Sequence, residues 1–248
     1  MQNLELILTR PNKAVYRRGD ECVKLFGEEW PVADILNEAL LQARVEEAGI
    51  PVPGLREVTK IDGKWAIISE YIEGKTLSAR LTAEPERMEE WLALLIRLQM
   101  DVHEKRSPQL PPQRDKLQRK ISASGLDATT RYELHVRLDA MQRTDKVCHG
   151  DFVPSNIILR EGDGAPCILD WAHATRGNAA ADAAATCIAL RKQGNDTYAA
   201  AYLRLYCEMS DTARQYMEKW IPIVAGAKLA ACKAEDRAFY AAFCEGVV

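Results

Sequence analysis

The sequence predicts an α+β fold in two lobes: a small N-terminal lobe of antiparallel strands with one helix, and a larger, mainly helical C-terminal lobe. Two observations support this prediction. Short apolar runs between turn signals fill the first seventy-odd residues, and amphipathic helical patterns take over after Gly74. We therefore expect lobes at residues 1–73 and 74–248. A chain of 248 residues is long enough to bury a full hydrophobic core.

The N-terminal lobe is expected to contain short strands around one helix. Pro31 suits the first turn of that helix and Gly49 suits its C-terminal cap, so the helix is predicted within residues 31–49. Alternating or branched apolar residues between turn signals such as Asp62-Gly63 mark the strands. The predicted strand segments are LELIL (4–8), AVYRR (14–18), ECVKLF (21–26), LREVTKI (55–61) and KWAIISEYI (64–72).

The C-terminal lobe is expected to be built from amphipathic helices. Apolar residues recur at helical spacing in residues 85–105, 114–121 and 129–143, and helical character returns from residue 179 onward. Pro222 either kinks a helix there or begins a new one. Two lobes of this kind would leave a cleft between them, and clefts between lobes are common ligand sites.

Composition and charge exclude several classes of function. A net charge of −3 with interspersed signs offers no basic field for nucleic acid. No apolar run is long enough to cross a membrane, and no secretory signal precedes the fold, so we expect a cytoplasmic protein. Seven scattered cysteines without a CxxC pair argue against both a disulfide framework and a zinc cluster. The expected partner is a small molecule, and the oligomeric state is left open.

Polar residues gather around a predicted hairpin at residues 156–170, NIILREGDGAPCILD. A five-residue loop, EGDGA, would give partner numbers that sum to 326, so Asn156 would face Asp170. Asp151 precedes Asn156 by five residues and can reach back to the same end. Amide and carboxylate oxygens suit a hard cation such as Mg²⁺, whereas zinc would favour nitrogen or sulfur.

A simpler interpretation applies to each of these residues alone. Asp and Asn in loops usually cap or turn the backbone, and only the convergence of Asp151, Asn156 and Asp170 favours a bound cation. His149 precedes a glycine, and we expect it to hold the loop by hydrogen bonds rather than to bind metal or transfer a proton.

The segments HGDFVPSN (149–156) and ILDW (168–171) resemble the HGDxxxxN catalytic loop and the metal-binding aspartate of the aminoglycoside phosphotransferase and choline kinase-like family, relatives of protein kinases. The resemblance implies a bilobal protein kinase-like fold. It also implies that Asp151 is the catalytic base and that Asn156 and Asp170 bind the metal. RGNAAADAA (176–184) resembles the family segment whose aspartate, here Asp182, braces the catalytic loop. The alternative is an acid favoured by the helix dipole, and the two can coexist.

The same resemblance requires a lysine for the α- and β-phosphates and a glutamate that positions it. Lys24 lies in an apolar strand with Cys22 and Phe26 on its own face, where an ammonium needs a partner. Glu38 shares a helical stripe with Leu41, which turns its carboxylate toward the core. The alternative for Lys24 is an edge-strand lysine that guards against aggregation.

Two further segments correspond to nucleotide-binding parts of the family. TRPNKAVY (9–16) stands at the phosphate-covering loop but contains no glycine, so Asn12 and the following backbone amides would have to bind the phosphates. This departure leaves the choice between ATP and GTP open. SEYIEGKTL (69–77) resembles the hinge, where the backbone of Glu70, Tyr71 and Ile72 would contact adenine. Its alternative is an edge strand that leaves the sheet.

The function implied by the resemblance is Mg²⁺-dependent transfer of the γ-phosphoryl group of ATP to a hydroxyl of a small molecule, a metabolite or an antibiotic. Mixed charges on the C-terminal helices and the basic segment 114–120 favour a hydroxylated metabolite over a polycationic aminoglycoside. One rival is a catalytically silent nucleotide-binding module. Another is a metal-dependent hydrolase that uses His149, Asp151 and Asp170 and leaves Lys24 and Glu38 idle.

Overall fold

The chain divides into two compact units, Met1–Arg80 with Pro154–His173 and Leu81–Val153 with Ala174–Val248. The structure is a computed structural model and describes residues 4–245. An antiparallel five-stranded sheet lies in the first unit and most helices lie in the second, which confirms the α+β class. The boundary between residues 73 and 74 stays a prediction; the first compact unit runs on to Arg80 and also includes the later hairpin.

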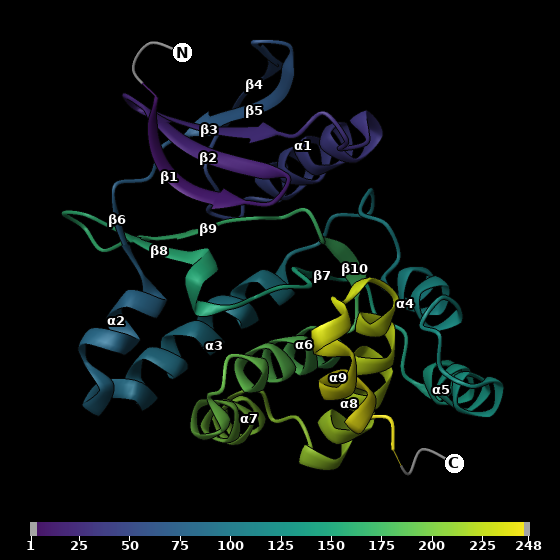
Figure 1. The fold of residues 1–248 in the computed structure, drawn as a ribbon. Coiled ribbons are helices and arrows are strands. Elements are labelled where there is room, and N and C mark those ends of the chain that lie inside the picture. The colour runs from purple at the N-terminus through teal and green to yellow at the C-terminus, as the bar shows by residue number, and fades with distance from the viewer. Residues whose placement is uncertain (1–3, 246–248) are drawn as a thin grey trace. The chain divides into compact units, whose positions relative to one another are not determined.

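The sheet of the first unit confirms the predicted strands (Figure 1). All neighbouring strands are antiparallel, in the order β1-β2-β3-β5-β4. Asp62 and Gly63 both adopt positive φ, 49° and 82°, in the tight turn between β4 and β5. The strands are β1 (Glu5–Arg10), β2 (Lys13–Arg18), β3 (Glu21–Phe26), β4 (Leu55–Ile61) and β5 (Lys64–Glu70).

Helix α1 (Val32–Glu47) covers one face of this sheet, as Figure 1 shows. Phe26 of β3 packs with Ile35 and Ala39 of α1 in a buried cluster on that face. Because side chains alternate along a strand, Lys24 points to the same face as Phe26 and therefore toward α1. The helix ends before Gly49, whose φ of 74° is the left-handed conformation expected of a C-terminal cap.

The predicted hairpin forms, but its expected register is wrong by one residue. Strand β8 (Ile157–Arg160) pairs with β9 (Pro166–Ile168) so that Ile157 faces Ile168, not residue 169. A backbone hydrogen bond of 2.9 Å from Arg160 N to Ala165 O closes the loop, which leaves 161–164 as a four-residue connection. Two glycines with positive φ inside this loop allow the shorter turn.

The hairpin is extended by a short strand, β6 (Gly74–Thr76), which pairs with β8. The three strands form a second sheet of the first unit, in the order β6-β8-β9. At the open end of the hairpin, Leu169 N donates to Asn156 O at 2.8 Å. The chain segments that carry Asn156 and Asp170 therefore leave the hairpin at the same end.

The second unit is built around α6, which is buried along most of its length. Its alanine-rich sequence lets α7 and α8 pack closely on it, while α3 packs on α7 and α4 packs on α8 and α5. The helices predicted within 85–105, 114–121 and 129–143 are confirmed. They are α3 (Met88–Glu104), α4 (Gln113–Ser122), α5 (Ala128–Ala140), α6 (Ala179–Lys192), α7 (Asp196–Ser210), α8 (Arg214–Lys228) and α9 (Arg237–Ala242).

Short elements complete the two units. Pro222 lies inside α8, which excludes the alternative that it begins a helix. A two-stranded sheet pairs β7 (Lys146–Cys148) with β10 (Thr175–Gly177), and α2 (Leu77–Ala83) follows β6 directly. Across the described residues, no helix combines the length and hydrophobicity that a bilayer crossing requires. The remaining short helical turns are η1 (Pro85–Arg87), η2 (Pro154–Asn156), η3 (Leu229–Ala231) and η4 (Ala234–Asp236).

Candidate active site

The first unit brings three of the predicted charged residues together. Lys24 Nζ forms an ion pair with Glu38 Oε1 on α1 and lies 3.3 Å from Asp170 Oδ1. The side chain of Lys24 is only 19% exposed, so its ammonium depends on these two carboxylates rather than on water. The alternative of an exposed edge-strand lysine is wrong, because β3 lies between β2 and β5 in the sheet.

The electrostatics of this group follow from its burial. Burial disfavours the charged form of Lys24, but the charges of Asp170 and Glu38 and their hydrogen bonds outweigh that effect and raise the pKa of the ammonium. Lys24 is therefore a fixed positive charge at neutral pH. Such a charge, held on a rigid strand by a helix carboxylate, suits an anionic ligand of high charge.

Asp170 occupies an unusual backbone conformation. Its φ is 61°, in the left-handed region that costs a non-glycine residue of order 1 kcal/mol. The neighbouring Trp171 is buried, and its indole N–H donates to Ile168 O at 3.0 Å, which fixes the turn after β9. Strain held in this way is often found at functional sites, since the surrounding structure must maintain it. The Asp170 carboxylate of the ILDW segment is therefore held on a turn that the Trp171 hydrogen bond fixes.

Asn12 lies in the tight turn between β1 and β2. Arg10 pairs with Lys13, so only two residues connect the strands. The turn is fastened to the end of β3, because Gly27 N donates to Asn12 O at 2.8 Å. A side chain at Gly27 would crowd that carbonyl at 3.2 Å, which explains the glycine there. The exposed Asn12 side chain is thus placed by a rigid turn that contains no glycine.

Two of the three predicted hinge residues, Glu70 and Tyr71, already donate their backbone N–H groups to other parts of the protein. Glu70 N donates to Gly54 O at 2.9 Å and Tyr71 N donates to Asp20 O at 2.9 Å. The Glu70 side chain forms an ion pair with Arg160 at 2.9 Å. Ile72 follows these residues and is buried. The alternative of a simple edge strand is wrong for Glu70, because β5 lies between β3 and β4.

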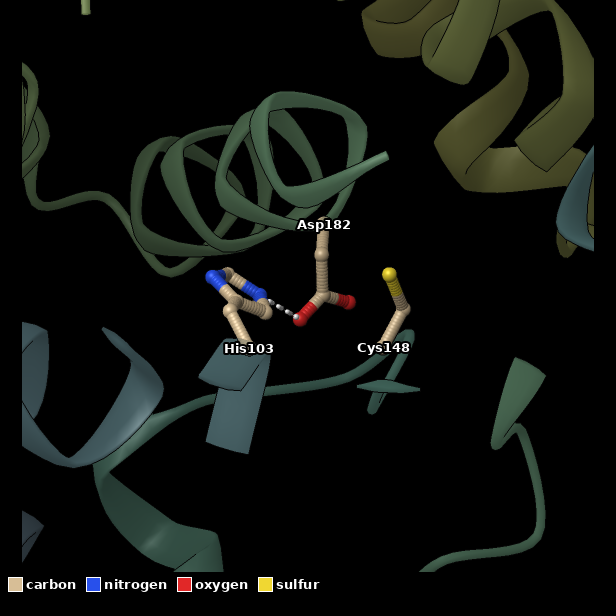
Figure 2. Close-up of side chains that lie close together, drawn as sticks. All are labelled: His103, Cys148 and Asp182. Atoms are coloured by element: carbon tan, nitrogen blue, oxygen red, sulfur yellow. Dashed lines mark hydrogen bonds and ion pairs between the residues drawn. The ribbon is translucent and has the colours of Figure 1, made fainter. Parts of the chain in front are cut away.

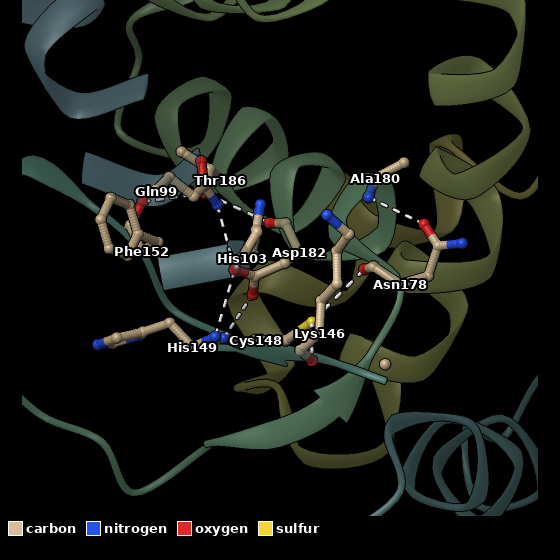
Figure 3. A network of polar contacts seen from close by, with 12 residues as sticks. Gln99, His103, Lys146, Cys148, His149, Phe152, Asn178, Ala180, Asp182 and Thr186 are labelled. Atoms are coloured by element: carbon tan, nitrogen blue, oxygen red, sulfur yellow. Dashed lines mark hydrogen bonds and ion pairs between the residues drawn. The ribbon is translucent and has the colours of Figure 1, made fainter. Parts of the chain in front are cut away.

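In the second unit, Asp182 holds the backbone that precedes Asp151 (Figure 3). Its carboxylate accepts hydrogen bonds from Gly150 N at 2.6 Å and His149 N at 3.2 Å. Asp182 lies in the first turn of α6, whose N-cap Asn178 accepts from Ala180 N at 2.9 Å. Asp182 therefore fits both interpretations. It is an acid at the N-terminal end of a helix, and it also accepts hydrogen bonds from the loop that precedes Asp151.

His149 makes the loop contacts expected of a structural histidine. The ring is fully buried, and its Nδ1 accepts a hydrogen bond of 3.2 Å from Asp151 N. Its Nε2 is therefore the protonated nitrogen in the neutral ring. The ring also packs edge-on against Phe152, with centroids 5.6 Å apart. These contacts, together with those of Asp182, fix the backbone on which the half-buried Asp151 stands.

A buried polar network extends from Asp182 to residues that sequence analysis did not single out. On α3, His103 Nε2 lies 3.1 Å and Gln99 Nε2 lies 3.2 Å from Asp182 Oδ2. Thr186 donates to Phe152 O at 2.9 Å, on the residue after Asp151. The available signal was a pair of polar residues, Gln99 and His103, four apart on the apolar stripe of a helix.

The pKa of Asp182 reflects this network. Complete burial acts to raise it, but the hydrogen bond and charge of His103 and the donated backbone N–H groups hold the pKa to about 2. Asp182 is therefore ionised at neutral pH, and His103 Nε2 must donate to it.

Asp182 also lies near His103 and Cys148, a trio that could in principle hold a metal ion (Figure 2). The surrounding bonds argue for a structural role instead. Both carboxylate oxygens already accept backbone N–H groups, and burial raises the pKa of the Cys148 thiol. The Cys148 thiol lies 3.6 Å from Asn178 O, close enough to donate to it. A cation here would have to displace hydrogen bonds that hold the Asp151 loop.

Comparison with known structures identifies the fold. Aminoglycoside-3′-phosphotransferase of type VIII is 19% identical, with 92% of this chain and 94% of that chain covered and a TM-score of 0.68. A ternary complex of aminoglycoside phosphotransferase APH(4)-Ia with AMP-PNP and hygromycin B is 13% identical, covers 99% and 93% of the two chains, and has a TM-score of 0.71. The predicted protein kinase-like fold is thereby confirmed.

A choline/ethanolamine kinase family protein from Mesorhizobium loti has the same fold, with 16% identity, coverage of 98% and 85% and a TM-score of 0.58. No curated protein sequence matches the chain. A family model does match it, across residues 11–220, and that range includes Lys24, Glu38, Asp151, Asn156, Asp170 and Asp182. The chain belongs to the phosphotransferase enzyme family.

Proposed function

We propose that this protein transfers the γ-phosphoryl group of ATP to a hydroxyl of a small molecule, with Mg²⁺ as the metal. The observation that carries the proposal is the position of Lys24, half-buried on β3 between Glu38 and Asp170. A half-buried cation held by one carboxylate, next to a second carboxylate on a strained turn, matches the requirements of a triphosphate with its metal.

The nucleotide assignment draws on the neighbours. Solved structures of APH(4)-Ia contain AMP-PNP or ADP, which supports ATP rather than GTP for this chain. We assign adenine recognition to the backbone around Ile72, since the N–H groups of Glu70 and Tyr71 already donate within the protein. Asn12 and the amides that follow it would contact the phosphates from a rigid turn rather than from a flexible glycine loop.

Asn156 and Asp170 would hold the metal. One supplies an amide oxygen and the other a carboxylate oxygen, from the same end of the hairpin, and this donor set fits Mg²⁺. When bound, Mg²⁺ would neutralise charge on the triphosphate. Lys24 would supply the positive charge of the protein itself toward the α- and β-phosphates.

Asp151 would accept the proton of the acceptor hydroxyl or orient that hydroxyl. Asp182 and His149 are positioning residues in this scheme, because they hold the backbone on both sides of Gly150. The rival metal-dependent hydrolase would leave Lys24 and Glu38 without a role, although the two form a buried ion pair. A silent module would retain nucleotide binding and produce no ADP.

The experiment compares Lys24→Met with Lys60→Met, an exposed lysine on β4 of the same sheet. ADP production is measured with Mg²⁺ across a panel of hydroxylated metabolites and antibiotics, and AMP-PNP affinity is measured by calorimetry. We expect Lys24→Met to lower kcat by roughly 10²–10³-fold, the effect of a lost electrostatic contact to the triphosphate, on which charge develops as the γ-phosphoryl group leaves. Lys60→Met should behave as wild type. Unchanged turnover in Lys24→Met would remove the basis for phosphoryl transfer.

A further inference from the structure

A cluster of lysines, Lys116, Lys120 and Lys228, lies in the second unit, outside the residues discussed so far. Lys116 and Lys120 are four residues apart on α4 and so share one face of that helix. Lys228 is the last residue of α8, which packs against α4. The following turn, η3, also contacts α4, so the end of α8 lies beside this helix. All three side chains are half-buried.

The lysine cluster begins close to the Asp151 loop. The first residue of α4, Gln113, accepts a hydrogen bond of 2.9 Å from the N–H of Asn178, the N-cap of α6. Lys116 follows Gln113 by three residues and lies on the same face. Asn178 caps the helix that carries Asp182, and Asp182 is the residue that holds His149 and Gly150. Lys120 lies one helical turn, ~6 Å, further along.

The charges of the lysine cluster oppose one another. Burial lowers the pKa of Lys116 to about 8, helped by repulsion from Lys120, Lys228 and the exposed Arg119, while Asp182 acts in the opposite direction. Burial and Lys228 likewise lower the pKa of Lys120. Lys120 and Lys228 are both half-buried and repel each other, which raises the energy of the protein, and an anion bound beside them would relieve that cost.

We propose that the lysine cluster binds an anionic group, a carboxylate or a phosphate, on the alcohol acceptor. This inference rests on the proposed function, since it places the acceptor hydroxyl at Asp151 and the anionic group at Lys120 and Lys228. A polycationic acceptor would meet three like charges on this wall and would be disfavoured. The acceptor class is therefore a hydroxy acid or a phosphorylated alcohol.

The test uses matched acceptors that differ in one substituent. One set is glycerol, 3-amino-1,2-propanediol, glycerate and glycerol 3-phosphate, and a second is glucose, glucosamine, gluconate and glucose 6-phosphate. ADP production gives kcat and KM for each compound with Mg²⁺-ATP. The variants are Lys120→Gln, Lys228→Gln and the double variant, with Lys219→Gln, an exposed lysine on α8, as the matched control. Circular dichroism verifies that each variant is folded.

We expect the anionic members to exceed their neutral counterparts in kcat/KM by ~10-fold or more, the effect of charge-assisted hydrogen bonds. The double variant should lose roughly 10- to 100-fold in kcat/KM for the anionic acceptors, mainly through KM, and Lys219→Gln should lose nothing. If the single variants fold and the double variant does not, the same shift in KM is sought in the singles. Preference for the neutral or cationic members would overturn the inference while phosphoryl transfer stands.

If no compound yields ADP, a titration with inorganic phosphate separates the two ideas. Nuclear magnetic resonance of the lysine Nζ groups would then show whether Lys120 and Lys228 respond to the anion. If the Nζ signals of Lys120 and Lys228 change saturably with phosphate and that of Lys219 does not, the lysine cluster binds anions and the proposed reaction is the part that is wrong. No response at either lysine overturns the anion site itself.

Discussion

Replacement of Asp182 by asparagine tests how the Asp151 loop is held. The side chain keeps its shape but loses its charge, and one acceptor oxygen becomes an NH₂ group that faces other donors. Gly150 N and His149 N donate to this carboxylate at 2.6 and 3.2 Å, together with His103 Nε2 at 3.1 Å. At least one buried donor therefore loses its acceptor, at a cost of ~1–3 kcal/mol.

The lost charge gives a second measure of the same loss. The pKa of Asp182 falls from 3.8 to about 2 on folding, so ionisation stabilises the native state by roughly 2 kcal/mol above pH 4. Because the folded pKa is the lower one, this stability is lost as the pH falls from about 4 through 2. The lowered pKa arises from the same hydrogen bonds, so the two figures overlap and do not add, and we expect a loss of ~2–3 kcal/mol at pH 7 for Asp182→Asn.

Urea unfolding followed by circular dichroism measures the loss. The difference between wild type and Asp182→Asn should be about 1 kcal/mol smaller at pH 3 than at pH 7, since the Asp182 carboxyl group of the unfolded wild type is then largely protonated while that of the folded protein stays mostly ionised. The control is Asp139→Asn, an exposed partner of Arg114 at 3.0 Å, for which we expect a change below ~1 kcal/mol. Equal free energies of unfolding for wild type and Asp182→Asn at pH 7 would refute the reasoning.

Three further predictions concern single substitutions. Asp151→Asn should leave the unfolding free energy nearly unchanged and lower kcat by roughly 10²–10⁴-fold, measured as ADP release; wild-type turnover would contradict its role as the base. Asp170→Ala should abolish activity together with its Mg²⁺ requirement, and a magnesium titration that matches wild type would count against the metal assignment. Lys116→Met should stabilise the protein by about 1–3 kcal/mol at pH 7, because the native pKa of about 8 lies below the ordinary 10.5. That gain should vanish between pH 8 and 10.5 as the wild-type lysine loses its proton, and a pH-independent gain in urea unfolding would exclude the charge as its cause.

Sequence periodicity was sufficient to predict the longer helices and strands. Residues 21–26 alternate and residues 32–47 repeat at helical spacing, and together these patterns place Lys24 and Glu38 on facing surfaces. Strands of three residues, such as β7 and β10, contain too few alternations to be recognised. Their pairing depends on tertiary contacts that no local pattern encodes.

The wrong hairpin register and the failure to predict a role for Gln99 and His103 have different physical origins. The hairpin register was wrong because two glycines in one loop permit connections of four or five residues, and the choice depends on packing. The role of Gln99 and His103 could not be predicted from their own helix. It depends on their hydrogen bonds to Asp182, a buried acid on another helix.

The pairing of Lys24 with Asp170 joins residues 146 positions apart in the chain. During synthesis, the five-stranded sheet emerges before the segment Pro154–His173 that completes the first unit. Until that segment has been made, Glu38 is the one of the two carboxylate partners that is available to Lys24. Closing a loop of this length costs conformational entropy, so we expect Asp170 to join Lys24 and Glu38 late in folding.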